Sequence, residues 1–467
     1  MITEISKQLD QKEISARDLV QKYINNIESK DTDIQAYLSV FKEEALNQAQ
    51  EIDKRRNQKE SLSPLAGIPF ALKDNMLVSG FKATAGSKIL ENYVSTYDAT
   101  VVSKLKKAGA ILLGKTNMDE FAMGSSTENS AFFTTKNPHD LSRVPGGSSG
   151  GSAASVAAEM SVFTLGSDTG GSVRQPASFC GVVGFKPSYG AVSRYGLMSM
   201  ASSLDVIGPF CQNVEDVKLI FETISGKDDF DATSIDVPHS DTPKSLKGLK
   251  IGIPKEYFVG GLDQEVELAI HGALEKIQKE GADIVEISLP QTKYALPCYY
   301  IIMPAEVSSN LARYDGIRYA PQEKEIKGEL WDLYLKNRGD GFGEESRRRI
   351  LLGTYVLSTG YYDAYYLKAQ KVRQLIRLDF KKAFESVDFI ITPTAPTTAF
   401  KIGEKATDPV SMYLSDIFTV SANLAGLPAI SLPIRKEVKL PIGLQIIGSY
   451  ASDYSLLNMA ELTEKLI

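Results

Sequence analysis

The stretch Gly146–Ala177 reads GGSSGGSAASVAAEMSVFTLGSDTGGSVRQPA. Two glycine-serine turns, Gly146–Ser152 and Asp168–Ser172, flank a short apolar segment. Glycine permits positive φ angles and a close approach of the backbone to a ligand. Consecutive N–H groups in such a turn can converge on a negatively charged oxygen. Ser148 and Ser172 carry hydroxyl groups on the two turns, and the segment between them has room for the end of a helix and a buried strand. We expect this geometry to bring the two turns together.

Composition sets limits on the class of protein. The chain has 467 residues and a formal net charge of −6, so no overall positive field indicates nucleic-acid binding. Three cysteines (Cys180, Cys211 and Cys298) lie far apart without a CxxC pair, which disfavours a disulfide framework or a zinc site and suits a reducing cytosol. No apolar run approaches the roughly 20 residues of a membrane span. The polar N-terminus resembles neither a signal peptide nor a transit peptide, so we expect a cytoplasmic protein.

Strands that alternate with helices favour an α/β layered fold, and we expect one large domain over residues 1–467. It would contain an N-terminal helical region, about residues 1–60, and a mostly helical region, about residues 294–384. Helices are predicted from Ser15 onward and at Glu43–Arg56, Ala99–Ala108, Asn117–Met123, Val214–Ile224, Gln264–Glu280 and Ala451–Ile467. Strands are predicted at Ala36–Phe41, Ile68–Lys73, Ala110–Leu113, Val182–Lys186, Leu249–Ile253, Asp283–Ser288, Asp388–Thr392 and Leu444–Ile447.

One segment matches a phosphate-binding pattern. Residues 109–116, GAILLGKT, fit G-x-x-x-x-G-K-[ST] letter for letter. In a true phosphate loop the strand precedes the first glycine, and the four intervening residues form the cradle. Here those four residues are apolar and strand-like. Nucleotide binding through Lys115 is therefore the least favoured of the functions considered.

A second pattern, G-x-S-x-G at residues 146–150, is typical of the nucleophile elbow of α/β-hydrolases. It would make Ser148 the nucleophile and would require a histidine later in the chain. The three histidines fit this role poorly: His139 precedes the serine, His239 lies in a polar loop, and His271 lies in an amphipathic helix. A hydrolase without histidine needs another base.

Lys73 is a candidate for that base, because serine–lysine pairs are known in hydrolases. A lysine accepts a proton only when it is neutral, so its pKa must be lowered by burial or by nearby positive charge. Lys73 ends the apolar run Ile68–Leu72 and could be desolvated there. The alternative is an ordinary lysine at a strand end that reaches toward water.

The quoted stretch resembles the signature of the amidase signature family, and the resemblance extends over essentially the whole chain. Ile68–Asn75 resembles the lysine motif of that family, with Lys73 placed 75 residues before Ser148, and Ser172 follows 24 residues later. The resemblance implies a mixed, twisted central β-sheet covered by helices on both faces. It also implies a Ser-cisSer-Lys triad in which Ser172 is the nucleophile, Ser148 the relay and Lys73 the base. The implied oxyanion hole is formed by backbone N–H groups of Thr169, Gly170, Gly171 and Ser172.

Within the family, the chain is most similar to the glutamine-hydrolysing subunits of tRNA-dependent amidotransferases. The supporting motifs are Tyr299–Ile302, Ser308–Arg313, Arg348–Thr354 and Gly360–Tyr366. This resemblance implies a heterotrimer in which ammonia released from glutamine passes to the B subunit, beside a small C subunit. The B subunit would use ATP and Mg²⁺ to activate glutamate on Glu-tRNA(Gln) and would make most of the tRNA contact. No cofactor or metal is expected in this chain. A free-standing amidase of the same family, acting on another amide, is the alternative.

Recognition of free glutamine needs a fixed cation for its carboxylate and a fixed anion for its ammonium. Arg349 and Asp416 are the candidates, because each lies beside apolar residues and each matches the pattern of these subunits. Tyr300 and Gln175 are expected to be hydrogen-bonding neighbours. The alternatives are a solvated basic face for Arg349 and a helix-start carboxylate for Asp416.

Overall fold

The structure is a computed structural model that describes residues 1–239, 243–258, 261–319, 328–434 and 440–467. Within these residues, one mixed sheet contains eleven strands in the order β1-β3-β2-β4-β6-β5-β10-β11-β9-β7-β8. The strands are β1 Tyr37–Val40, β2 Pro69–Lys73, β3 Ile111–Thr116, β4 Phe163–Asp168, β5 Val183–Lys186, β6 Val206–Cys211, β7 Lys250–Pro254, β8 Asp283–Ile287, β9 Phe389–Pro393, β10 Ala429–Pro433 and β11 Gly443–Ile447. β2 is parallel to β3 and β4. Every residue of β2 is buried, which explains its continuous apolar sequence.

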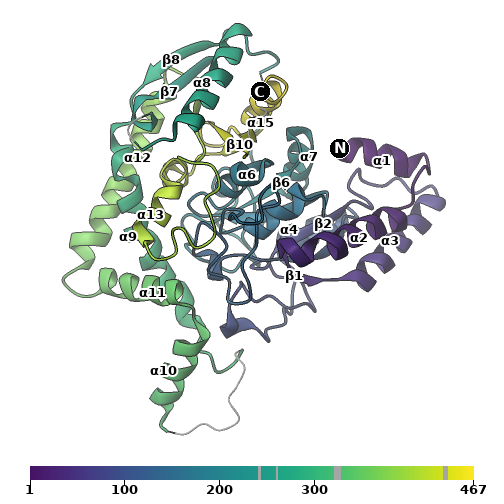
Figure 1. The fold of residues 1–467 in the computed structure, drawn as a ribbon, viewed down its shortest axis with the longest axis horizontal. Helices are drawn as coiled ribbons and strands as arrows, with labels where there is room; N and C mark the ends of the chain where they lie inside the picture. Colours follow the sequence, from purple (N-terminus) through teal and green to yellow (C-terminus); the bar gives the residue numbers. More distant parts are fainter. Residues whose placement is uncertain (240–242, 259–260, 320–327, 435–439) are drawn as a thin grey trace.

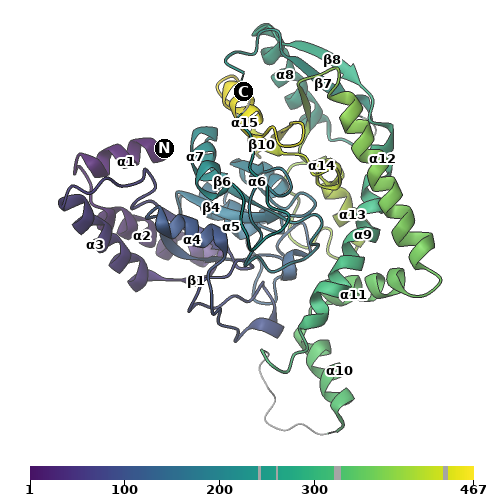
Figure 2. The same ribbon diagram turned by 180° about the vertical axis from the view of Figure 1, so that it is seen from behind.

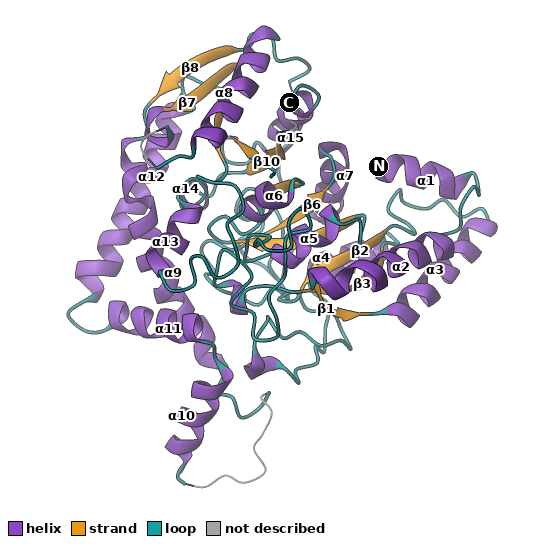
Figure 3. Cartoon of the chain, viewed as in Figure 1, coloured by secondary structure: helices purple, strands orange, loops and turns teal. Residues whose placement is uncertain are grey.

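Helices flank the sheet (Figure 3). They are α1 Ile2–Asp10, α2 Ala16–Ile34, α3 Lys42–Asn57, α4 Thr100–Lys107, α5 Gly150–Ala157, α6 Arg174–Cys180, α7 Val214–Ile224, α8 Gln264–Lys279, α9 Ala295–Asn310, α10 Leu330–Gly341, α11 Glu344–Leu357, α12 Lys368–Ala383, α13 Pro409–Tyr413, α14 Val420–Ala425 and α15 Asp453–Glu464. Short 3₁₀ helices occur at Lys88–Leu90, Glu120–Ala122, Lys255–Tyr257, Pro290–Tyr294, Leu311–Arg313 and Leu414–Asp416, and a π-helix at Tyr362–Leu367. The mixed α/β class is confirmed. The single domain stays a prediction.

The N-terminal helices and the long helices of the later chain lie on opposite sides of the molecule. α1, α2 and α3 cover one end, whereas α8, β7 and β8 form the other, and α9, α11 and α12 run along its flank (Figure 1). α10 projects away from the body in both views (Figure 2). β2, β4, α5 and α6, which come from the motif-bearing stretches, lie toward the middle. No helix in the described ranges has the length and apolar character that a bilayer crossing requires.

One sequence prediction was wrong in a way that matters for the site, and a second gave a strand that is too short. The helix predicted at Asn117–Met123 is reduced to a single 3₁₀ turn, with positive φ at Phe121 (48°) and Ala122 (64°). The chain instead wraps around the Asp119 carboxylate, which accepts hydrogen bonds from the N–H groups of Thr127 and Asn129 at 2.9 and 3.0 Å. The strand predicted at Ala110–Leu113 is confirmed and extends to Thr116.

That continuation removes the phosphate-loop interpretation. Gly114 and Lys115 are strand residues of β3, which pairs with β1 and β2. The Lys115 ammonium is fully buried and forms an ion pair with Asp74 at 3.0 Å. The backbone of the residues that would form a phosphate cradle is therefore paired with neighbouring strands.

Candidate active site

Lys73 lies at the carboxyl end of β2, between β3 and β4, and its side chain is fully buried. Its Nζ donates to the hydroxyl oxygens of Ser148 (2.7 Å), Ser149 (2.9 Å) and Ser167 (3.0 Å). Burial lowers the pKa of Lys73 to about 7, although the negative charges of three nearby aspartates oppose this shift. Burial therefore favours the neutral form of Lys73, which is the state that a general base requires.

The turn that presents Ser148 is held by buried groups. Gly146 has φ +83°, and the peptide bond between Gly147 and Ser148 is cis, in agreement with the resemblance. The Gln175 Oε1 accepts a hydrogen bond from the Gly147 N–H at 3.0 Å, and its Nε2 donates to the Ser125 carbonyl at 2.9 Å. Gln175 was expected beside the substrate, but both ends of its amide bind backbone groups. The structure gives Gln175 the task of supporting this turn.

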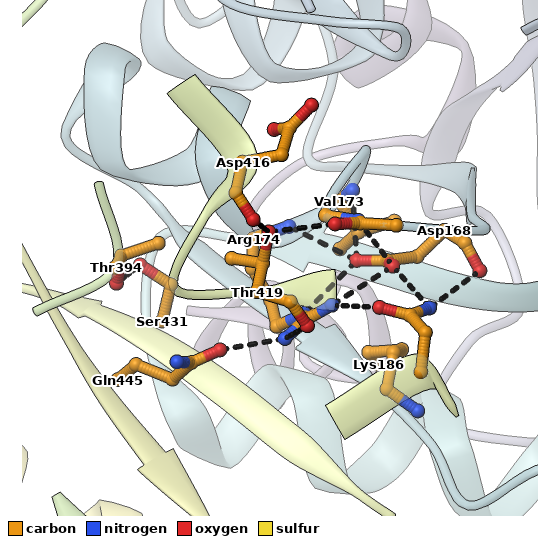
Figure 4. A network of polar contacts seen from close by, with 12 residues as sticks. Asp168, Val173, Arg174, Lys186, Thr394, Asp416, Thr419, Ser431 and Gln445 are labelled. Carbon is orange, nitrogen blue, oxygen red and sulfur yellow. Dashed lines mark hydrogen bonds and ion pairs between the residues drawn. The ribbon is translucent and has the colours of Figure 1, made fainter. Parts of the chain in front are cut away.

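The turn that presents Ser172 is organised by one carboxylate. Asp168 accepts hydrogen bonds from the N–H groups of Gly171 (2.9 Å) and Val173 (3.1 Å). The Arg174 guanidinium binds both Asp168 oxygens at 3.0 Å, and Figure 4 shows this ion pair at the centre of a polar network. Burial alone would raise the pKa of Asp168, but the Arg174 charge holds it at about 2. A permanently ionised carboxylate thus fixes the backbone of the turn.

The Ser172 hydroxyl is unengaged in this structure. Its residue is 8% exposed, and within the described residues its Oγ forms no hydrogen bond, including none to Ser148. The lysine–relay contact of the expected triad is therefore present, whereas the relay–nucleophile contact is open. Catalytic hydrogen bonds in ligand-free structures are often long and tighten only when substrate binds.

The expected oxyanion donors differ in availability. The Gly171 N–H is directed to Asp168, whereas the N–H groups of Thr169, Gly170 and Ser172 bind no acceptor among the described residues. A methyl group at Gly170 would lie 2.7 Å from the Tyr299 ring, so this position is closely packed. Three free N–H groups beside a free hydroxyl can stabilise the negative oxygen of a tetrahedral intermediate.

Asp416 lies close to this turn, since a Cβ added at Gly171 would be 3.1 Å from its Oδ1. The Ser125 hydroxyl donates to Asp416 Oδ2, but Oδ1 is buried and has no hydrogen-bond partner among the described residues. Burial raises the pKa of Asp416 to about 7, although the Ser125 hydrogen bond and the Arg174 and Arg349 charges oppose the shift. A buried oxygen without a partner is costly, and a cationic ligand would satisfy it.

Arg349 projects from α11 and is 3% exposed. Its Nε donates to Glu345 at 2.8 Å, and its guanidinium carbon lies 5.4 and 5.5 Å from the ring centres of Tyr300 and Tyr413. The solvated basic face considered for Arg349 is therefore wrong. Arg349 lies against the Tyr300 ring, and its charge also acts on the Asp416 carboxyl. Their shared role in a glutamine pocket stays a prediction.

Several supporting residues were missed by the sequence reasoning. Three of them, Ser149, Asp168 and Arg174, lie within Gly146–Ala177. The charges of Asp168 and Arg174, which stand among glycines and serines, could have indicated an ion pair there. Ser125 and Thr419 come from distant parts of the chain and carried no local signal. The Thr419 hydroxyl donates to the Gly170 carbonyl at 2.6 Å and so anchors the nucleophile turn from α14's N-terminal side.

The histidines lie elsewhere. His139 contacts the Cys180 carbonyl through Nε2 at 2.9 Å, His239 stacks on Tyr454, and His271 is half-exposed on α8. Among the described contacts, none joins a histidine to Ser148 or Ser172. The nucleophile-elbow interpretation therefore lacks its base.

Comparison with known proteins agrees with this geometry. A family model described as Amidase matches residues 18–457. The A subunit of glutamyl-tRNA(Gln) amidotransferase from Carboxydothermus hydrogenoformans is 56% identical over 466 residues, which cover 99% of this chain and 96% of that protein. Its counterpart in Moorella thermoacetica is 55% identical over 462 residues, which cover 98% of this chain and 94% of that protein.

Solved structures give the same result. The crystal structure of the glutamyl-tRNA(Gln) amidotransferase A subunit from Thermotoga maritima superposes with a TM-score of 0.80 at 44% identity, over 96% of this chain and 91% of that one. A crystal structure described only as an amidase superposes with a TM-score of 0.84 at 29% identity, over 99% and 98% of the two chains. The chain belongs to the amidase family, and its full-length identity of 55–56% places it among the glutamyl-tRNA(Gln) amidotransferase A subunits of that family.

Proposed function

We propose that Lys73, Ser148 and Ser172 hydrolyse the side-chain amide of glutamine. The observation that carries this proposal is the 2.7 Å contact between the Ser148 hydroxyl and a fully buried lysine whose pKa is about 7. Neutral Lys73 accepts a proton from Ser148, which in turn accepts one from Ser172 as the Ser172 Oγ attacks the amide carbon. The N–H groups of Thr169, Gly170 and Ser172 stabilise the resulting oxyanion.

The same proton then completes the first half-reaction. It returns through Ser148 to the amide nitrogen, the carbon–nitrogen bond breaks, and ammonia leaves. A glutamyl ester remains on Ser172. Water, activated through the same relay, attacks the ester and releases glutamate, which restores the free serine.

Glutamine recognition rests on two charges in the proposal. The unpartnered Oδ1 of Asp416 accepts the substrate ammonium, and the Arg349 guanidinium binds its carboxylate. An arginine–carboxylate contact can be bidentate, which lysine cannot reproduce. Tyr300 packs against the guanidinium and supports its orientation.

A comparison of substrates tests this pocket. Arg349→Lys and Asp416→Ala should each lower kcat/KM for glutamine by an amount equivalent to about 1.5–3 kcal/mol, the value of a charged hydrogen bond. A simple primary amide without the two charged groups should be hydrolysed equally by the variants and the wild type. Equal losses for both substrates would mean that these residues only support the fold. Faster hydrolysis of the simple amide than of glutamine by the wild type would favour the free-standing amidase.

We further propose that the ammonia passes to the B subunit of a heterotrimer that also contains a C subunit. In this scheme the partner, and not this chain, uses ATP and Mg²⁺ to convert Glu-tRNA(Gln) to Gln-tRNA(Gln). The names of the relatives, which call them subunits, support an assembly. Three buried free cysteines support a reducing, cytoplasmic setting.

An exposed apolar face also supports the assembly. Trp331, Leu335 and Leu351 are 74%, 69% and 71% exposed, and they line a groove of about 650 Å³ between α10 and α11. No residue of α10 is buried. Since an isolated helix of this length is marginal in water and large exposed apolar faces mark interaction sites, a second protein chain would complete this region.

A further inference from the structure

Glu345 links Arg349, the proposed carboxylate-binding residue, to Tyr413. One of its oxygens, Oε1, accepts hydrogen bonds from the Arg349 Nε and from the Tyr413 hydroxyl, both at 2.8 Å. The other oxygen pairs with Arg348. Burial would raise the pKa of Glu345, but the Arg349 charge and these hydrogen bonds lower it. Glu345 is therefore a fixed negative charge at neutral pH.

The contact with Arg349 leaves part of the guanidinium available. Glu345 occupies the Nε edge, and Nη1 has only the weak acceptor Met303 Sδ at 3.6 Å among the described residues. The two terminal nitrogens of the Arg349 guanidinium are thus held in a fixed plane and form no hydrogen bond to a strong acceptor among the described residues. A bidentate contact with a carboxylate requires such a fixed plane.

The contact with Tyr413 joins two elements that are distant in the sequence. Glu345 lies in the first turn of α11, whereas Tyr413 ends α13. The Tyr413 ring stacks on Tyr300, with centroids 3.9 Å apart and an interplanar angle of 23°. A cavity of about 160 Å³ is lined by Glu345, Arg349 and Tyr413. Through one carboxylate oxygen, two residues that line this cavity, Arg349 and Tyr413, are fixed together.

We propose that Glu345 is a positioning residue that sets the preference for glutamine over amides without an α-carboxylate. It does so by fixing the plane of Arg349 and by holding Tyr413 in its stack on Tyr300, beside the guanidinium. The inference rests on the proposed role of Arg349 in binding the substrate carboxylate. It assigns Glu345 no contact with the reacting atoms, so Glu345 should affect glutamine binding and leave the chemistry of the serine unchanged.

Steady-state kinetics of two variants and a matched control test this inference. Glu345→Gln removes the charge with little change in shape, and Tyr413→Phe removes the hydroxyl while keeping the stacked ring. Glu344→Gln is the control, because Glu344 is the adjacent residue, is 82% exposed and pairs with Arg348 and not with Arg349. Glu345→Gln should raise KM for glutamine roughly tenfold, and Tyr413→Phe should raise it less. For both, kcat and the hydrolysis of a simple amide should stay near wild type, and Glu344→Gln should behave as wild type throughout.

Two results would overturn the inference: equal losses for glutamine and the simple amide, or a Glu345→Gln variant that matches Glu344→Gln. If Glu345→Gln fails to fold in a thermal melt, the same criteria apply to Tyr413→Phe. Arg349→Lys, measured in parallel, distinguishes a failure of this inference from a failure of the proposed glutamine pocket. A selective loss in Arg349→Lys without one in Glu345→Gln contradicts the positioning role alone, whereas no selective loss in Arg349→Lys contradicts the pocket.

Discussion

At the scale of single residues, Lys73 gives the proposed reaction its pH dependence. Its pKa is lowered to about 7 by burial, and only the neutral form accepts a proton. Activity should therefore be low below pH 6 and rise through pH 7 as the lysine loses its proton. Lys73→Arg retains a charge that cannot readily be removed, so it should lose on the order of 10⁴-fold in kcat, as a lost triad member does. The measurement is kcat for glutamine against pH, and a profile that is flat between pH 6 and 8 would contradict the assignment.

The histidines should be dispensable. None of them has a catalytic contact within the part of the chain that the structure describes. The His139 ring contacts a backbone carbonyl, the His239 ring stacks on a tyrosine, and His271 is a half-exposed residue of α8. A triple change to alanine should keep hydrolysis within a few-fold of wild type, provided that circular dichroism shows a folded chain. A folded but inactive triple variant would mean that the base is a histidine.

Asp416 makes a separate pH prediction. Burial raises its pKa to about 7, and only the ionised carboxylate binds an ammonium strongly. The ratio of kcat/KM for glutamine to that for a simple amide cancels the common titration of Lys73. This ratio should increase as pH rises through 7, and it should become independent of pH in Asp416→Asn. A constant ratio in the wild type would show that Asp416 does not contact the substrate ammonium.

The sequence indicates which residues belong to the site better than it indicates what each of them does. Lys73 and the two serines stand out because their residue types and neighbours in the sequence fit the chemistry. The choice of Ser172 as nucleophile, and of Arg349 and Asp416 as the pocket charges, rests on the resemblance to the family. The structure joins Lys73 to Ser148 and places Asp416 beside the turn that carries Ser172, while the roles of all five residues stay predictions. Gln175 looked like a substrate contact, because the sequence alone could not show that the Gly147 N–H and the Ser125 carbonyl use its amide.

At the scale of elements, the turn Asp168–Ser172 should tolerate no side chain at its glycine Gly171. Gly171 has φ +144°, and a Cβ there would lie 2.2 Å from the Thr419 hydroxyl oxygen. Gly171→Ala should therefore lower stability by about 1–3 kcal/mol and reduce kcat by displacing the neighbouring N–H donors. Gly80→Ala is the control, since Gly80 has φ +82° with open space around it. Full turnover and an unchanged melting temperature in Gly171→Ala would contradict this role.

Because Lys115 is part of the buried strand β3, a substitution of Lys115 cannot test nucleotide binding. Because Lys115 and Asp74 form a buried pair, Lys115→Ala leaves an uncompensated charge and should destabilise the fold by about 3–5 kcal/mol. The loss would come from folding and not from nucleotide binding. The direct measurement is the melting temperature of the wild-type chain with and without ATP. We expect no shift, since a ligand stabilises only what it binds, and a clear increase would revive the nucleotide interpretation.

The elements found from sequence are those with strong local patterns. The sequence predicts α7 at its observed bounds, Val214–Ile224, and it predicts α8 and β8 correctly except at their C-terminal ends. β6 and β10 were missed, since Val206–Cys211 contains a glycine and a proline, and both strands are defined by antiparallel partners distant in the chain. Sequence periodicity cannot supply such pairing.

At the scale of the whole molecule, the projecting α10 should be required for assembly and not for folding. Trp331→Glu combined with Leu335→Glu should abolish co-purification with untagged partner subunits, because it places two charges on the apolar face. The melting temperature of the chain alone should not change, since α10 buries no residue of its own. Leu268→Glu on α8 is the control, because Leu268 is 62% exposed at a different place on the surface. Recovery of the double variant with its partners at the wild-type level would show that another surface holds the complex.

The function of the whole molecule depends most directly on which serine carries the glutamyl group. Glutamine is mixed with the complex, the reaction is quenched in acid within the first turnover, and the acylated peptide is mapped by mass spectrometry. We expect an ester on Ser172, beside the three free N–H groups, and no ester in Ser172→Ala. An ester on Ser148 or Ser149 would contradict the proposed mechanism and restore the nucleophile-elbow interpretation.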